Sequence, residues 1–154
     1  MKLVTFTVAD KEYAAEVSLV REVIRMRPAI PVPESAPFVE GVIKLRGRIV
    51  PVINLRVKLG LERQAADRLN RIIITHVGES NIGIVVDKVF DVVNIPDSSI
   101  EAPDEILKEA AYLIGVAKAG SRVILLVDFV KLLSSEDHQS LADIHAQIEI
   151  KKTT

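Results

Sequence analysis

The side chains that could carry acid–base or metal chemistry are few in this chain of 154 residues. Asp87 and Asp128 each follow an apolar run, and two carboxylates at strand ends can serve acid–base catalysis. Both occupy matching places in an internal repeat, which instead favours structural roles as caps of the turns that follow. His138 and His145 lie seven residues apart in a predicted helix, and a metal site there needs Glu149 as a further ligand. Solvated residues on an exposed helix face are the favoured interpretation of these three.

Motifs for nucleophilic, zinc or phosphate chemistry are missing from the sequence. The chain has no Cys, which excludes disulfides, thiolate metal sites and cysteine nucleophiles. It also has no G-x-S-x-G, H-E-x-x-H, P-loop or G-x-G-x-x-G segment. No catalytic centre, cofactor site or metal site is therefore predicted from these motifs.

Composition narrows the classes of partner. Apolar residues make up 49% of the chain, yet no run reaches the ~18 residues that a membrane-spanning helix requires. The formal net charge is −1 with both signs interspersed, and there is no Trp, so neither a basic surface nor a stacking platform favours nucleic acid. The N-terminus enters a strand pattern without the features of a signal peptide. We expect a soluble intracellular protein that neither inserts into a membrane nor binds nucleic acid.

The central stretch of the chain, residues 41–55, has the pattern of a β-hairpin. Residues 41–45 and 48–53 form two apolar strands, and Arg46 and Gly47 form the tight turn between them. Gly47 can adopt the positive φ that such turns demand. The turn exposes the side chain of Arg46.

This hairpin occurs twice in the sequence. Residues 115–129 repeat the pattern of residues 41–55, and residues 82–93 repeat that of residues 13–24. Two copies made mostly of short strands indicate two small β barrels rather than a solenoid, which needs more repeats. Closing each sheet removes exposed edges, and the seam between the barrels is a usual place for a binding groove. The predicted organisation is a single domain, 1–154, with subdomains at approximately 14–80 and 1–13 plus 81–133, and a C-terminal helix at 135–148.

Short helices are predicted at the ends of several strands. Ser18 is an expected N-cap of a helix over residues 19–25, which carries Glu22 one position too late for a capping box. Asn54 is an expected cap of a helix over residues 55–59.

The other elements expected from the sequence are strands and connections. They are a hairpin of residues 3–8 and 13–17, an extended Pro-rich connection at 26–37, a loop at 62–70, and strands at 71–77, 82–86, 112–118 and 122–127.

The conspicuous features that remain are an exposed turn arginine, Arg46, and an acid that helix chemistry leaves unexplained, Glu22. Apolar positions lie near both in the sequence. Desolvated apolar anchors accompanied by charges that fix the register are typical of protein interfaces. We therefore interpret these residues as parts of a binding surface for another protein.

Three segments resemble one family, the bacterial chemotaxis coupling proteins CheW. They are Gly-Val-Ile-Lys-Leu-Arg-Gly-Arg-Ile-Val-Pro-Val-Ile-Asn-Leu-Arg at residues 41–56, Val-Arg-Glu-Val-Ile-Arg at 20–25, and Ile-Gly-Ile-Val-Val-Asp at 82–87. The resemblance extends from the first strand to Leu133. It implies a mainly β fold of two intertwined five-stranded SH3-like β barrels packed around a shared hydrophobic core, with short helices and a C-terminal helix.

The same resemblance implies a non-enzymatic adaptor that links the cytoplasmic tips of chemoreceptors to the histidine kinase CheA, in the cytoplasm at membrane-associated receptor arrays. The family's partner-binding acid and arginine fall by motif on Glu22 and Arg46, and Val20 is an apolar neighbour. Lys44 stands where the family usually has Asn, and it is expected to set the charge of a partner contact.

Two other functions share the same patterns. A kinase-side regulatory module that does not bind receptors has the fold that the resemblance implies, since that fold also forms the regulatory domain of CheA. A small-molecule enzyme or binder in the seam between the barrels is the second alternative.

Overall fold

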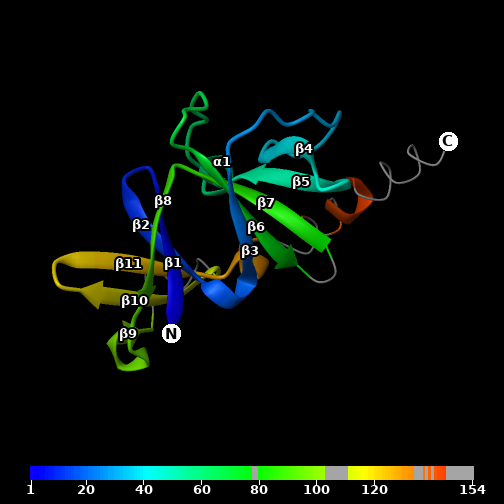
Figure 1. The fold of residues 1–154 in the computed structure, drawn as a ribbon. Coiled ribbons are helices and arrows are strands. Elements are labelled where there is room, and N and C mark those ends of the chain that lie inside the picture. The colour runs from blue at the N-terminus through cyan, green and yellow to red at the C-terminus, as the bar shows by residue number, and fades with distance from the viewer. Residues whose placement is uncertain (78–79, 103–110, 134–136, 138, 140, 145–154) are drawn as a thin grey trace.

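A computed structural model of the chain describes all residues except 78–79, 103–110, 134–136, 138, 140 and 145–154. Most of the described residues are in β-strands, and the helical segments are short (Figure 1). The strands are β1 (Lys2–Val8), β2 (Lys11–Glu16), β3 (Val20–Arg25), β4 (Val39–Leu45), β5 (Arg48–Asn54), β6 (Arg71–Val77), β7 (Ser80–Val86), β8 (Lys88–Asn94), β9 (Ile100–Glu101), β10 (Leu113–Ala119) and β11 (Arg122–Val127). The helices are α1 (Leu55–Lys58) and α2 (Phe129–Leu132), with 3-10 turns at Val17–Leu19 and Asp97–Ser99.

The strands form two sheets with the same topology. One sheet has the order β3-β6-β7-β5-β4, and the other has the order β8-β1-β2-β11-β10 with the short β9 at its edge. The two orders become identical when β1 to β5 are matched with β6, β7, β8, β10 and β11. Each sheet therefore combines two strands of one half of the chain with three of the other half, as the paths of the blue and green strands show in Figure 1. The predicted intertwining of the two halves is confirmed, and both halves contribute their strands in the same order.

Both sheets close in the same way. Ile30, which follows the edge strand β3, pairs with Val42 on the opposite edge strand β4 through two hydrogen bonds of 2.8 and 2.9 Å. In the second sheet β9, which follows the edge strand β8, pairs with β10. Closure satisfies backbone groups that an open edge would leave exposed. The predicted mainly β fold class is thereby confirmed, with β9 as an additional short strand.

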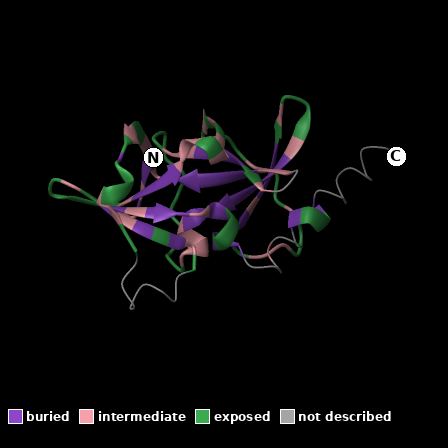
Figure 2. Ribbon diagram, turned by 90° about the horizontal axis from the view of Figure 1, so that it is seen from below, coloured by how far each residue is buried: buried purple, intermediate pink, exposed green. Residues whose placement is uncertain are grey.

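Buried apolar side chains separate into three clusters. Most of the buried residues belong to strands, which are largely purple in Figure 2. One cluster belongs to the β3-β6-β7-β5-β4 sheet alone, a second to the other sheet alone, and the largest combines residues of both. The largest cluster is the shared core that joins the two barrels. Its most deeply buried members are Phe6, Val8, Ala15, Ile53, Ile73, Ile84 and Val86.

Asparagine and aspartate caps start the two short helices, as predicted. Asn54 Oδ1 accepts a hydrogen bond of 3.4 Å from the Val57 amide at the start of α1. Asp128 Oδ1 accepts one of 2.9 Å from the Val130 amide at the start of α2. Each helix follows the second strand of a repeated hairpin, so these equivalent caps are part of the duplicated design.

The helix predicted over residues 19–25 is wrong. Val20–Arg25 is the strand β3, and Ser18 lies inside the 3-10 turn that precedes it rather than at a helix N-cap. The β-branched residues Val20, Val23 and Ile24 favour a strand, and pairing with β6 supplies the backbone hydrogen bonds that a helix would otherwise make.

The chain passes from one sheet to the other a few residues after the predicted subdomain boundaries. All of β2 lies beside β1, so the first crossing is at Val17–Leu19 instead of at residues 13–14. All of β7 lies beside β6, so the second crossing is at Asp87 instead of at residues 80–81. A hairpin pairs along its whole length, which keeps both of its strands in one sheet.

The C-terminal helix predicted over residues 135–148 lies only partly within the described residues. Asp137, Gln139 and residues 141–144 are helical. Leu141 and Ile144 are buried in the shared core, which confirms that both lie on its apolar stripe. His138, His145 and Glu149 are outside the described residues. Within the part of the chain that the structure describes, no helix is long and apolar enough to cross a membrane.

Candidate functional site

The structure brings together two of the four residues predicted to bind partners. Glu22 lies on the edge strand β3, and Arg46 lies in the turn between β4 and β5. Arg46 Nη1 donates to Glu22 Oε2, so the two side chains form an ion pair between segments 24 residues apart. The Arg46 side chain is 75% exposed and that of Glu22 is 24% exposed. The arginine therefore keeps most of its surface open to a partner.

The turn that presents Arg46 is the predicted two-residue hairpin turn. Arg46 has a φ of 51° and Gly47 a φ of 78°, and Leu45 pairs with Arg48 across the turn. Positive φ at both central positions is the signature of a type I′ turn, which matches the twist of the flanking strands. The left-handed conformation of Arg46 itself is a feature that the sequence did not indicate.

Glu22 has one oxygen in the ion pair and one without a partner. Its Oε1 atom is buried and accepts no hydrogen bond from any residue in the described part of the chain. A buried carboxylate oxygen without a donor costs about 1–3 kcal/mol, which a donor from a bound partner would recover. Glu22 Oε1 can therefore accept a hydrogen bond from a donor on a bound partner.

The other two predicted residues flank this pair without joining it. Val20 is half-buried on β3 and packs against the shared core. Lys44 is exposed on β4, and its backbone carbonyl accepts a hydrogen bond of 3.2 Å from Arg27 Nη1. Among the described residues, the Lys44 ammonium group has no ion pair with Glu22 or any other acid. Its charge is therefore available to a partner.

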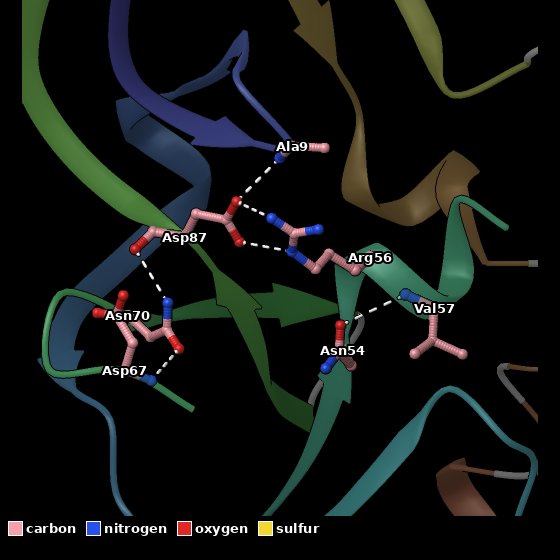
Figure 3. A network of polar contacts seen from close by, with 7 residues as sticks. All are labelled: Ala9, Asn54, Arg56, Val57, Asp67, Asn70 and Asp87. Carbon is pink, nitrogen blue, oxygen red and sulfur yellow. Dashed lines mark hydrogen bonds and ion pairs between the residues drawn. The ribbon is translucent and has the colours of Figure 1, made fainter. Parts of the chain in front are cut away.

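Asp87 is the centre of a separate polar network at the seam between the sheets (Figure 3). Its Oδ2 atom accepts hydrogen bonds from the Ala9 amide at 2.9 Å and from Arg56 Nη2 at 2.6 Å, and its Oδ1 atom accepts one from Arg56 Nε at 3.0 Å. The bond to Asp87 raises the pKa of the Arg56 guanidinium. The prediction that Asp87 caps the turn that follows it is wrong. Its carboxylate instead accepts hydrogen bonds from the Ala9 amide, in the turn between β1 and β2, and from the Arg56 guanidinium. Asp128 does cap its helix, as expected.

The same network holds the loop before β6. Asn70 Nδ2 donates to the backbone oxygen of Asp87 at 3.2 Å, and Asn70 Oδ1 accepts from the Asp67 amide at 2.8 Å (Figure 3). A cavity of about 310 Å³ lies beside these residues, lined also by Thr7 and Phe90. Both carboxylate oxygens of Asp87 are occupied, so it is poorly suited to act as a general base. Among the described residues, no group of three His, Asp or Glu side chains is arranged to hold a metal ion.

Replacing Asp87 by Asn is expected to lower the free energy of unfolding by about 2 kcal/mol, because the substitution leaves the partly buried Arg56 without its carboxylate. Asp128→Asn is the matched control and is expected to change stability by only a few tenths of a kcal/mol, because Asn caps a helix as well as Asp does. Urea unfolding of both variants measures the difference. Equal losses of unfolding free energy in the two variants would contradict a stabilising role of the Asp87–Arg56 ion pair at the seam between the sheets.

Comparison with known proteins places this arrangement in a family. The model of the CheW-like domain matches residues 2–137. The chain is 36% identical to the chemotaxis protein CheW of Klebsiella aerogenes, over 86% of this chain and 81% of the relative, and 34% identical to that of Bacillus subtilis, over 90% of each. The crystal structure of the scaffolding protein TtCheW from Thermoanaerobacter tengcongensis superposes with a TM-score of 0.82 and 31% identity, covering 88% of this chain and 94% of that one. The chain belongs to the CheW family.

Proposed function

We propose that this protein is a non-enzymatic chemotaxis adaptor that couples chemoreceptor cytoplasmic tips to the histidine kinase CheA in signalling arrays. Family membership supports the adaptor role, since its relatives are named as chemotaxis proteins and a solved neighbour as a scaffolding protein. On this proposal the protein acts in the cytoplasm and reaches the membrane-associated array by binding receptors. Its surfaces bind proteins, and it uses neither a cofactor nor a metal.

The ion pair between Glu22 on β3 and Arg46 in the β4–β5 turn is the main observation that supports the proposal. A receptor tip is a long helical hairpin bundle, and its apolar stripe would lie along the seam between the barrels beside Val20. Arg46, which is 75% exposed, would pair with an acid of the receptor. A basic residue of the receptor would donate to the unpartnered Oε1 of Glu22. The exposed Lys44 would add a further charge to the contact.

The kinase contact is proposed to use the barrel built on β3 to β7. The regulatory domain of CheA is expected to contain matching barrels, and two copies of one fold can pack in a pseudosymmetric arrangement. Residues around 41–60, apart from Lys44 and Arg46 that are proposed for the receptor contact, form the surface proposed for the kinase contact. A protein made of two similar barrels can thus present one surface to the receptor and one to the kinase.

Isothermal titration calorimetry of the purified protein against a receptor cytoplasmic fragment, and separately against the regulatory domain of CheA, tests the proposal. We expect saturable binding to both. Binding to the kinase domain alone would instead identify a kinase-side regulatory module that does not touch receptors. Binding to neither would mean that this chain shares the family's fold without its function.

A further inference from the structure

Four arginines line one groove on the barrel built from β3 to β7. Arg25 ends β3, Arg27 follows in the extended segment, Arg68 lies in the loop before β6, and Arg71 begins β6. The groove has a volume of about 800 Å³. The chain as a whole has a formal net charge of −1, so the positive charge of this groove is local. A cleft lined by charges of one sign focuses its electric field on ions of the opposite sign.

Two of these arginines face each other directly. Arg25 and Arg71 are cross-strand partners in the antiparallel pair of β3 and β6. Directly opposed residues place their Cβ atoms about 5 Å apart, and like charges in that position destabilise a sheet. Arg71 Nη1 also donates to the backbone oxygens of Arg68 and Asn70, both at 2.9 Å, which holds the Arg71 side chain beside the loop that carries Arg68.

The carboxylates that line the groove are engaged with other groups. Glu40 Oε1 accepts from Asn54 Nδ2 at 2.8 Å and from Arg63. Asp67 Oδ1 accepts from the Leu69 amide at 2.5 Å within its own turn. In the described part of the chain, none of the four groove arginines forms an ion pair with an acid. The residues that line the groove, four arginines and two carboxylates among them, carry a net formal charge of +2.

We propose that this groove binds a phosphorylated small molecule of nucleotide size, with its phosphate groups between Arg25 and Arg71. Guanidinium groups bind phosphate oxygens in a bidentate manner, and one phosphate accepts from several arginines at once. A ligand with two or more negative charges compensates the two excess positive charges, whereas a single carboxylate compensates one.

The remaining walls suit the uncharged part of such a ligand. Met26, Pro28, Ala29, Ala66 and Leu69 give the groove an apolar side. The volume of about 800 Å³ lies within the range of small-molecule sites, roughly 300–1,000 Å³, and far exceeds the size of inorganic phosphate. This site is separate from the Glu22–Arg46 pair and does not depend on the adaptor function.

Calorimetric titration with ATP, inorganic pyrophosphate and a hexaglutamate peptide tests the proposal. ATP is expected to bind saturably, and Arg25→Gln and Arg71→Gln are each expected to weaken it at least tenfold. The matched control Arg48→Gln removes an exposed arginine of β5 outside the groove and should leave ATP affinity unchanged. Pyrophosphate that binds more weakly than ATP would support a ligand of nucleotide size, and equal affinities for the two would contradict that size.

A second measurement needs no ligand. Arg25→Gln removes one of two facing like charges, so the melting temperature of the free protein should rise while ATP binding falls. The proposal is overturned if neither phosphate compound binds saturably, if Arg48→Gln loses as much affinity as Arg25→Gln, or if only hexaglutamate binds. A melting temperature that falls in Arg25→Gln would contradict the mutual repulsion from which the site is inferred.

Discussion

Replacing Gly41 by Ala is expected to lower the free energy of unfolding by more than about 3 kcal/mol. Gly41 has a φ of 141°, in a region that residues with a Cβ rarely adopt. An added Cβ would lie 2.1 Å from the backbone oxygen of Ile30. That oxygen accepts the Val42 amide in the bridge that closes the barrel, so it cannot move away without opening the closure. Chemical denaturation of wild type and variant measures the loss.

Gly60→Ala is the matched control for this prediction. Gly60 also has a positive φ, 81°, but an added Cβ there meets no atom within 4 Å. Its substitution carries only the cost of a left-handed conformation, about 1–2 kcal/mol. Equal destabilisation of the two variants would show that backbone conformation alone matters and that the close approach to Ile30 does not.

Reversing the charge of Arg46 is expected to weaken receptor binding by at least about 30-fold, which corresponds to the ~2 kcal/mol typical of a central interface residue. Arg46→Glu would place a second carboxylate beside Glu22 and repel the receptor acid proposed to bind there. The fold should survive, since Arg46 is exposed in a turn and surface substitutions change stability little. Calorimetry against the receptor fragment and a thermal melt measure the two effects.

The double variant Glu22→Arg with Arg46→Glu separates a binding role from a structural one. The swapped pair can form the same ion pair within the chain, so it should recover any stability lost in the single variants. It presents the wrong charge to a partner at both positions, and receptor binding should remain weak. Recovery of binding together with stability would show that the pair only holds the turn against β3.

The repeated hairpins and their caps could be predicted because local signals specify them. Gly47 marks the two-residue turn, and Asn54 and Asp128 begin helices directly after apolar strands. The strand β3 could not be predicted in the same way. Its apolar residues Val20 and Val23 are three apart, which also fits a helix, and only pairing with a strand about 50 residues later decides between the two.

The candidate site was predicted in part for a similar reason. Glu22 and Arg46 were identified by resemblance to the family, but their mutual ion pair joins two elements and has no local signature. The link between Asp87 and Arg56 spans 31 residues, and the bond from Ala9 to Asp87 spans 78. The facing of Arg25 and Arg71 depends on strand register, which the sequence pattern did not specify across so long a connection.

Co-purification of three components tests the adaptor role most directly. A tagged regulatory domain of CheA is immobilised on a resin. A receptor cytoplasmic fragment is then added, first without this protein and then together with it. We expect that the receptor fragment is retained only when this protein is present, and that Arg46→Glu releases the receptor fragment while the adaptor stays on the kinase domain. Retention of the adaptor without the receptor fragment would contradict the claim that this protein couples the two.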